Sequence, residues 1–238
     1  MPEELGAILD NLDEKEVINF GDLVLTSGIW KDLNQKKIYI TTAWSGWGKV
    51  SSSRAATRLI SASYKNSKVD IVLFTGVAGA ANKKLKQWDI LVANSVIQHD
   101  MDARPLYEKF HIPVFNKKIL KPKEKLLNKI FKSLSVNKER GDLKKFGNIS
   151  KGLIATGDKF ISDKKEMNKL NNEIPHLMAV EMEGAAFAQV AEQEKIDWLI
   201  LRVISDSADD SAKEDFSSFI NEYKNFSLNL IKVCLSDF

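Results

Sequence analysis

Residues 178–186 read MAVEMEGAA, and residues 199–206 read LILRVISD. Each stretch is an apolar run that ends in carboxylates, at Glu181 and Glu183 in the first and at Asp206 in the second. A carboxylate at the end of a buried strand costs free energy unless it is hydrogen-bonded or takes part in chemistry. In open α/β sheets, ligands bind just outside the carboxyl ends of the strands. The two stretches therefore predict two strands whose ends outline a polar pocket.

Strand and helix patterns alternate along the rest of the chain. Strands are predicted at residues 37–42, 69–75, 89–96, 152–155, 178–181 and 198–204, and helices at residues 49–64, 121–134, 184–194 and 216–233. This order predicts an α/β fold with a central, mixed but mostly parallel twisted sheet flanked by helices. No repeat, linker or low-complexity tract interrupts the sequence, so residues 1–238 are expected to form a single domain.

Composition and charge narrow the possible functions only a little. The 238 residues carry a formal net charge of +3, and the basic residues lack interleaved aromatics, so nucleic-acid binding is not indicated. No apolar run approaches the roughly 18 residues of a transmembrane helix. The lone cysteine, Cys234, allows neither an intrachain disulfide nor a cysteine metal site. With an acidic start that lacks signal-peptide order, these features favour a cytoplasmic location.

Two further motifs accompany the predicted strands. Gly76-Val77-Ala78-Gly79 follows an apolar strand, where glycines let the backbone approach a ligand, although glycines are common after strands. Residues 99–102 (HDMD) contain metal-ligand types, but no second histidine stands at the spacing of a metal-binding motif, so a structural role is favoured. No pattern indicates a metal or an organic cofactor.

Each charged residue in the opening stretches also has a structural interpretation. Glu181 and Glu183 are suitable charges for a helix N-terminus, and Asp206 with Ser205 is able to cap a following helix. Arg202 lies inside an apolar strand and needs a carboxylate partner, for which Glu4, Glu181 and Asp206 are all candidates.

Together these motifs resemble the 5'-methylthioadenosine/S-adenosylhomocysteine nucleosidases of the nucleoside phosphorylase and nucleosidase superfamily. The matching segments are, in chain order, residues 1–4 (MPEE), 45–50 (SGWGKV), 75–79 (TGVAG), 99–102 (HDMD), 156–161 (TGDKFI), 180–183 (VEME) and 204–206 (ISD). The resemblance implies hydrolysis of the N-glycosidic bond of 5'-substituted adenosines (methylthioadenosine, S-adenosylhomocysteine, 5'-deoxyadenosine), with release of adenine. The transition state is expected to resemble an oxocarbenium ion.

The resemblance implies catalytic roles for three acids. Asp206 matches the general acid that protonates purine N7, which requires a carboxyl kept protonated by an apolar setting or by another carboxylate. Glu4 matches the acid that activates the attacking water. Glu183 matches the residue that binds the ribose hydroxyls.

The resemblance also implies substrate contacts and a homodimer. Met182 would pack under the ribose, Phe160 would stack on the adenine, and the backbone of Ile161 would read the edge of the base. The other implied substrate-binding residues are Met1, Trp47, Val77, Ala78, Gly79, Glu181, Arg202 and Ser205. Phe110 and Pro113 lie in the region that, in the family, closes the partner subunit's pocket.

The sequence departs from the family pattern in four places. Trp47 replaces a smaller aliphatic residue beside the 5' substituent and would narrow that part of the pocket. Val77 replaces a serine or threonine. Arg104 is not part of the family pattern, and it is placed either to pair with Asp102 or to meet an anionic group of the substrate. The family also has a short strand before the segment that matches MPEE, so we expect either a sheet without that strand or a start downstream of the natural one.

Two alternative functions stay open from the sequence. A phosphorylase of the same fold would use phosphate, which related enzymes hold with an arginine shortly before the glycine motif. This chain has Leu73-Phe74-Thr75 there, so water is the favoured nucleophile. A non-catalytic nucleoside-binding protein would bind its ligand and release it intact.

Overall fold

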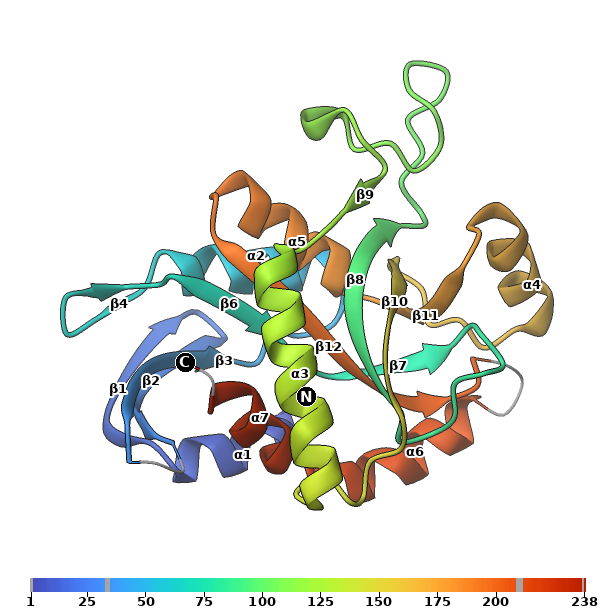
Figure 1. Cartoon of the computed structure of the whole chain (residues 1–238). Helices are drawn as coiled ribbons and strands as arrows, with labels where there is room; N and C mark the ends of the chain where they lie inside the picture. Colours follow the sequence, from blue (N-terminus) through green and yellow to red (C-terminus); the bar gives the residue numbers. More distant parts are fainter. Residues whose placement is uncertain (1, 33–34, 209–211, 237) are drawn as a thin grey trace.

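The computed structural model describes the backbone of residues 2–32, 35–208, 212–236 and 238, and the side chains of these residues other than 2–4, 7 and 213–215. Figure 1 shows helices on both sides of a curved central sheet, with a smaller sheet beside it. The helices are α1 Pro2–Asp10, α2 Gly48–Ile60, α3 Glu124–Arg140, α4 Lys164–Glu173, α5 Gly184–Gln193, α6 Ala212–Tyr223 and α7 Ser227–Leu235. The strands are β1 Asp13–Phe20, β2 Leu23–Lys31, β3 Lys37–Ala43, β4 Ser63–Tyr64, β5 Ser67–Lys68, β6 Ile71–Phe74, β7 Val77–Ala80, β8 Ile90–Gln98, β9 Ile119–Leu120, β10 Ile149–Thr156, β11 Leu177–Glu181 and β12 Asp197–Asp206. The predicted α/β class, with helices flanking a mixed sheet, is confirmed.

The central sheet closes on itself through its longest strand. Its order is β6-β12-β7-β11-β10-β8-β9, and β12 also pairs with β8. The first half of β12 pairs in parallel with β6 and its last residues pair in parallel with β7. Because β7 pairs antiparallel with β11, Gly79 lies opposite both Val180 and Asp206. The two acid-bearing strands thus run in opposite directions, and their carboxyl ends meet across the short β7.

Alternation along β12 distributes its side chains between two cores. Ile200 and Ile204 pack in the core formed with α2 and α5, whereas Leu201 and Val203 pack in the core formed with α3, α6 and α7. A strand buried on both faces reads as a continuous apolar run, as this one does. The same period of two puts residue 202 on the α2–α5 side, so Arg202 is carried into the protein interior.

A three-stranded antiparallel sheet, β1-β2-β3, precedes the central sheet, and the sequence patterns predict only β3 of it. Strand β1 is exposed along almost its whole length and therefore shows no apolar alternation. Strand β2 is buried at most positions but contains polar and glycine residues that mask its pattern.

Several predicted elements have different limits in the structure. The helix predicted at residues 49–64 ends at Ile60, and Ser63–Tyr64 forms a hairpin with β5 through left-handed backbone at Lys65 and Asn66. The helix predicted at residues 216–233 is two helices, α6 and α7. They are separated near Phe226, whose ring packs edge-on against Trp88 at 5.8 Å.

The sequence patterns also did not predict β7 and α4. The residues after Gly76 form the short strand β7 rather than a loop, because both of its neighbours, β11 and β12, pair with it. Helix α4 begins after Asp163, whose side chain accepts hydrogen bonds from the backbone N–H groups of Lys165 and Glu166. The Asp163-x-x-Glu166 spacing resembles a helix-capping sequence and would have signalled this helix.

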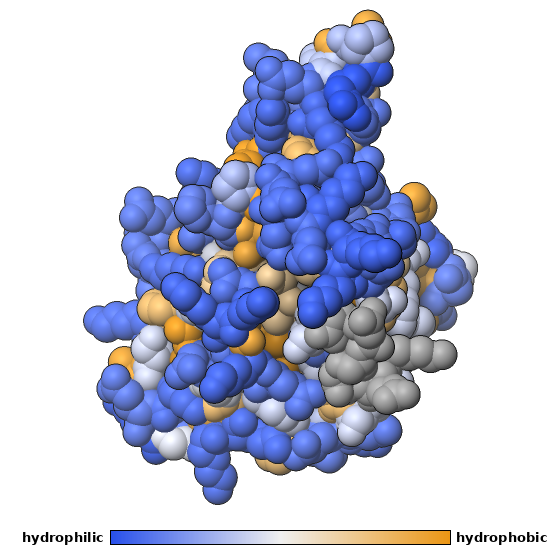
Figure 2. Space-filling view, turned by 90° about the vertical axis from the view of Figure 1, so that its right-hand side faces the viewer, coloured by the Kyte–Doolittle hydropathy of each residue, from blue (hydrophilic) through white to orange (hydrophobic). Residues whose placement is uncertain are grey.

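A long excursion, residues 99–118, connects β8 to β9 and rises above the rest of the molecule in Figures 1 and 2. The face in Figure 2 is largely hydrophilic, with hydrophobic residues gathered in a few small areas. Phe110 is buried in its own chain, in one cluster with Ile161. The large apolar side chains that the excursion exposes are Leu106, Tyr107 and Val114. Within the described ranges, no helix has the length and apolarity needed to cross a membrane.

Candidate functional site

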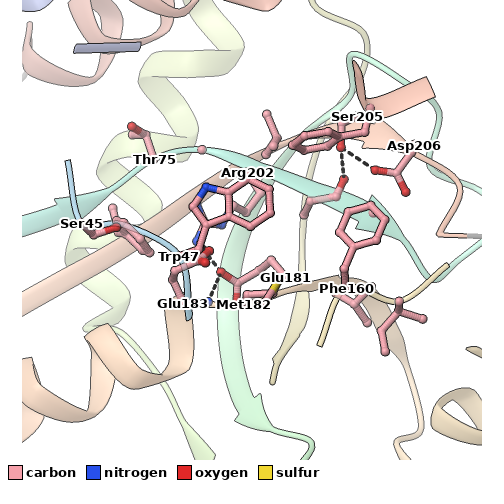
Figure 3. A pocket seen from close by; sticks show the side chains of 18 of the residues that line it. Ser45, Trp47, Thr75, Phe160, Glu181, Met182, Glu183, Arg202, Ser205 and Asp206 are labelled. Carbon is pink, nitrogen blue, oxygen red and sulfur yellow. Dashed lines mark hydrogen bonds and ion pairs between the residues drawn. The ribbon is translucent and has the colours of Figure 1, made fainter. Parts of the chain in front are cut away.

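One cavity gathers most of the predicted site residues at the carboxyl ends of β11 and β12 (Figure 3). The volume of this cavity is about 110 Å³. The predicted residues that line it are Trp47, Val77, Ala78, Gly79, Phe160, Ile161, Glu181, Met182, Glu183, Arg202, Ser205 and Asp206. Lining residues that were not predicted are Trp44, Ser45, Gly46, Phe74, Thr75, Gly76, Lys159, Val180 and Phe216. Most of these neighbour a predicted motif in sequence, but no sequence signal would have identified Phe216.

Arg202 and two glutamates form a charged cluster at one side of the cavity. The Arg202 guanidinium is paired with the Glu181 carboxylate, and both side chains are almost fully buried. The Glu183 carboxylate lies 3.7 Å from the same guanidinium nitrogen, Nη2. On its other side, the guanidinium carbon lies 4.4 Å from the centre of the Phe74 ring. Of the three candidate partners for Arg202, Glu181 is therefore the one that the structure brings to it among the described side chains.

Glu181 also caps helix α5. Its carboxylate accepts hydrogen bonds from the backbone N–H of Gly184 (2.8 Å) and of Glu183 (3.1 Å), and from the Thr156 hydroxyl. An acid at this end of a helix is stabilised by the free N–H groups and the helix dipole. Glu181 therefore has the structural role of a charge at a helix N-terminus. Its carboxylate also fixes the start of α5 relative to Arg202.

Glu183 faces the cavity and is held from the opposite wall. Its Oε1 accepts a hydrogen bond of 2.9 Å from the backbone N–H of Gly48, at the start of α2. Burial, together with the negative charge of Glu181, raises the pKa of Glu183 above its ordinary value. Arg202 opposes this shift without cancelling it. The negative charge of Glu183 is therefore less stable in the cavity than that of a solvent-exposed glutamate.

We expect Glu183→Gln to raise the melting temperature at neutral pH while lowering activity about 10- to 100-fold. A carboxyl with a raised folded-state pKa contributes stability that is complete below its unfolded value, near 4.5, and lost as pH rises through the folded value. Glutamine is neutral at every pH and can still accept from Gly48. The gain in melting temperature, measured by calorimetry, should vanish as pH falls toward about 4. An unchanged melting temperature at neutral pH would contradict this prediction.

Asp206 lies on the other side of the cavity from the glutamates, next to Phe160 (Figure 3). Its Oδ2 accepts a hydrogen bond of 2.7 Å from the Ser205 hydroxyl, and its Oδ1 accepts one of 2.8 Å from the backbone N–H of Ala208. These bonds form a turn directly after β12 rather than the cap of a helix, since α6 begins at Ala212. Asp206 is thus buried, oriented and presented to the cavity.

The glycines of the motif after β6 make room for these charged groups. A Cβ at Gly76 would collide with Nη1 of Arg202, and a Cβ at Gly79 would lie 2.8 Å from Oδ1 of Asp206. Real Cβ atoms do not approach other atoms so closely. The motif was predicted to let the backbone approach a ligand, and in the structure it lets the backbone approach two candidate site residues.

An aromatic wall borders the mouth of the cavity. The Phe216 ring from α6 packs edge-on against Trp47 at 6.2 Å and against Phe160 at 5.8 Å. Trp47 remains about half exposed at this rim. Three aromatic rings, with Phe216 in contact with the other two, thus border this part of the cavity.

The HDMD motif anchors the loop that carries Phe160. Asp100 accepts hydrogen bonds from the Lys49 ammonium (2.7 Å) and from the backbone N–H of Asp158 (2.9 Å). The described residues contain no group of three or more potential metal ligands. Arg104 forms two side-chain hydrogen bonds with Asp102, at 2.8 and 2.5 Å, which with a backbone bond hold the pKa of Asp102 at about 2.

Two predicted site residues have side chains outside the described part of the chain, and two others lie on the excursion. Met1 and the side chain of Glu4 lie outside the described residues. Phe110 and Pro113 lie on the excursion, where Phe110 is buried and Pro113 begins a short 3-10 turn.

Known proteins are similar to this chain over nearly its whole length. The family model of the phosphorylase superfamily matches residues 1–236. The 5'-methylthioadenosine/S-adenosylhomocysteine nucleosidase of Staphylococcus epidermidis is 32% identical over 223 residues, which cover 93% of this chain and 90% of that protein.

Two solved structures have similar folds over the full chain. The methylthioadenosine/S-adenosylhomocysteine nucleosidase from Colwellia psychrerythraea, in complex with adenine, superposes with a TM-score of 0.85 at 28% identity, covering 100% of this chain and 92% of that one. The futalosine hydrolase of Helicobacter pylori strain 26695 superposes with a TM-score of 0.82 at 32% identity, covering 100% and 95%.

Proposed function

Because the chain belongs to the 5'-methylthioadenosine/S-adenosylhomocysteine nucleosidase family of the phosphorylase superfamily, we propose that it hydrolyses 5'-substituted adenosines to adenine and the free sugar. Family membership makes it an N-glycoside hydrolase, and the identity of the substrate is the proposal. The observation that carries the proposal is the placement of the buried Asp206 and the partly buried Glu183 on opposite sides of one aromatic-rimmed cavity.

In the proposed reaction, the carboxyl of Asp206 donates its proton to N7 of the purine as the bond between C1' and N9 breaks. Ser205 and Ala208 hold this carboxyl in place. The base leaves as neutral adenine, and the sugar acquires positive charge. Glu183 binds the ribose hydroxyls, and its destabilised negative charge is offset by the developing cation. Water adds to C1' and gives its proton to Glu4.

The charge of the cavity favours water over phosphate as the nucleophile. The described side chains that line it include three acids, Glu181, Glu183 and Asp206, against Arg202 and Lys159. Arg202 is engaged by Glu181, and Lys159 pairs with Glu166 at 2.7 Å. A phosphate dianion would therefore enter beside several carboxylates with no cation dedicated to it.

A phosphate-free assay for released adenine tests the proposal. The substrates are methylthioadenosine, S-adenosylhomocysteine, 5'-deoxyadenosine and adenosine. Adenine released from an adenosine substrate without phosphate is the expected result. Strict dependence on phosphate, with ribose 1-phosphate as a product, would establish the phosphorylase alternative. Ligand recovered intact after binding would establish the non-catalytic alternative.

Trp47 is expected to limit the size of the 5' substituent. It directly precedes Gly48, whose N–H holds Glu183, so its ring borders the part of the cavity proposed for the sugar. We expect Trp47→Ile to raise kcat/KM for S-adenosylhomocysteine about 10-fold relative to 5'-deoxyadenosine, which has no 5' side group to accommodate. Steady-state kinetics with the two substrates measures the ratio. An unchanged ratio would remove Trp47 from the specificity pocket.

We also propose a homodimer formed through the excursion, as the family resemblance implies. The exposed side chains of Leu106, Tyr107 and Val114 supply an apolar surface there. Light scattering should give the mass of a dimer, and Leu106→Asp with Val114→Asp should give a monomer. A monomeric wild-type chain at micromolar concentration would contradict this expectation.

A further inference from the structure

The first turn of α2 holds carboxylates that come from two other parts of the chain. Trp47, at the N-cap of α2, makes no side-chain capping hydrogen bond, and the first turn contains no acid. The Gly48 N–H donates instead to Oε1 of Glu183, at 2.9 Å. The next N–H, of Lys49, donates to Oδ1 of Asp158, at 2.7 Å. Because a helix N-terminus attracts anionic groups, the start of α2 ties the segment after β11 to the loop after β10.

The side chain of Lys49 makes a second connection to the same loop. Its ammonium lies 2.7 Å from Oδ1 of Asp100, and the two side chains are only 21% and 32% exposed. Oδ2 of Asp100 in turn accepts a hydrogen bond of 2.9 Å from the backbone N–H of Asp158. Lys49 thus contacts Asp158 directly through its backbone and indirectly through Asp100. We call these three residues the latch.

Close packing holds the loop of the latch from two sides. A Cβ at Gly48, where φ is +84°, would lie 2.9 Å from Oδ1 of Asp158. A Cβ at Gly157 would lie 2.3 Å from Nε2 of His99, whose ring is buried. Real Cβ atoms do not come so close to other atoms. The loop therefore lies between α2 and His99 without room for an added methyl group on either glycine.

The ion pair of the latch is present at neutral pH. Burial by itself would raise the pKa of Asp100, but hydrogen bonds from the Lys49 ammonium and the Asp158 N–H bring this pKa below its ordinary value. Removal of the ammonium would leave a partly buried carboxylate without its cation. The contact between Lys49 and Asp100 is therefore the part of the latch that a single substitution can break.

We propose that Lys49 is a positioning residue that sets the distance between two substrate-binding groups, Phe160 and Glu183. The two side chains lie apart at the cavity (Figure 3), and Lys49 does not line it. Glu183, proposed to bind the sugar, is held by the residue before Lys49. Phe160, proposed to stack on the base, follows Asp158 by two residues. The latch thus connects the sugar side of the site to the base side, and this inference rests on the proposed function.

The expected signature of this role is a loss of kcat. The bond that breaks joins the base to the sugar, so an error in the separation of Phe160 and Glu183 falls on the two reacting atoms. Adenine alone uses only the base side of the site. Its affinity should therefore change little when the latch is broken, whereas turnover of the whole nucleoside should fall.

The principal test is Lys49→Met, which keeps the length of the side chain and removes its charge. We expect kcat for adenine release to fall about 10- to 100-fold. Lys49→Arg, which can still pair with Asp100, should restore kcat to within about 5-fold of the wild-type value. Lys123→Met is the matched control, because Lys123 pairs with Asp197 at 2.6 Å, at the opposite end of β12 from Asp206. It should leave kcat unchanged.

A second variant breaks the same contact from the other side. Asp100→Asn removes the charge that Lys49 meets but keeps an acceptor for the N–H of Asp158. It should lower kcat in the same way, and it keeps the inference testable if Lys49→Met folds poorly. Values of kcat within about 2-fold of wild type in both variants would overturn the proposal.

A double variant distinguishes positioning from a general loss of stability. If Lys49 acts partly through Glu183, then Glu183→Gln should lower kcat less in the Lys49→Met background than in the wild type. Strictly additive losses of activation free energy would overturn the positioning role. Equal losses of kcat in Lys49→Met and the control Lys123→Met would overturn it as well.

Hydrogen exchange tests the latch independently of activity. Amides of residues 157–160 should exchange about 10-fold faster in Lys49→Met than in Lys123→Met. Unchanged exchange would overturn the latch. If the wild-type chain releases no adenine, faster exchange would uphold the latch, and the failure would belong to the proposed function. If the wild type is active and Lys49→Met is equally active, the proposed function stands and the positioning role is overturned.

Discussion

Asp206→Asn should abolish adenine release while leaving adenine binding intact. An asparagine side chain can accept from the N–H of Ala208 and donate to the hydroxyl of Ser205, so the turn after β12 should keep its geometry. An amide has no proton to give to N7 at neutral pH. Loss of a general acid costs about 10²- to 10⁴-fold in rate, and the expected change in kcat lies in that range.

The measurement is kcat in the phosphate-free assay, with adenine affinity by calorimetry and the melting temperature on the same preparation. Ser205→Ala is the matched control, because it removes one hydrogen bond to Asp206 and keeps the carboxyl. We expect Ser205→Ala to lower kcat much less than Asp206→Asn does. Near-normal turnover by Asp206→Asn would remove Asp206 from the mechanism.

Arg202→Met should be the most destabilising single change in the site, at about 3–5 kcal/mol. Arg202 and Glu181 are almost fully buried together, so removing the cation leaves a buried carboxylate without its charge partner. Glu183, 3.7 Å from the same guanidinium, loses its neighbouring cation as well. Since a protein of this kind is stable by only about 5–15 kcal/mol, the variant is expected to be marginal at 37 °C.

A double-mutant cycle separates charge from packing. Methionine fills much of the arginine's volume and can still pack on the Phe74 ring. Adding Glu181→Gln removes the stranded charge while keeping an acceptor for the N–H of Gly184. The double variant should recover a large part of the lost stability in chemical denaturation. Additive losses would show that Arg202 acts through its packing alone.

The sequence predicted the site residues best where a motif lies at the end of a strand. The runs before Glu181 and Asp206 are apolar except at Arg202 and Ser205, so burial of both faces and the position of the acids follow from local sequence. The same holds for Phe160 and Trp47, which stand in short motifs. These residues line one cavity, and their individual roles stay predictions for the experiments above.

Other features depended on contacts between distant segments. Strand β7 exists because two strands of the central sheet pair with it, and nothing in four small residues requires that. Phe216 reaches the cavity only because α6 folds back over its mouth, where it meets Trp47 and Phe160. The choice of Glu181 as the partner of Arg202 was likewise open among three acids.

By itself, the sequence determined the α/β class, the strands that carry the acids and the motifs that identify the family, because hydrophobic period and strand-end chemistry are local properties. Only the tertiary structure decided that β11 and β12 run in opposite directions and meet across β7 at Gly79. Pairing partners are a property of the assembled chain, and local sequence does not encode them.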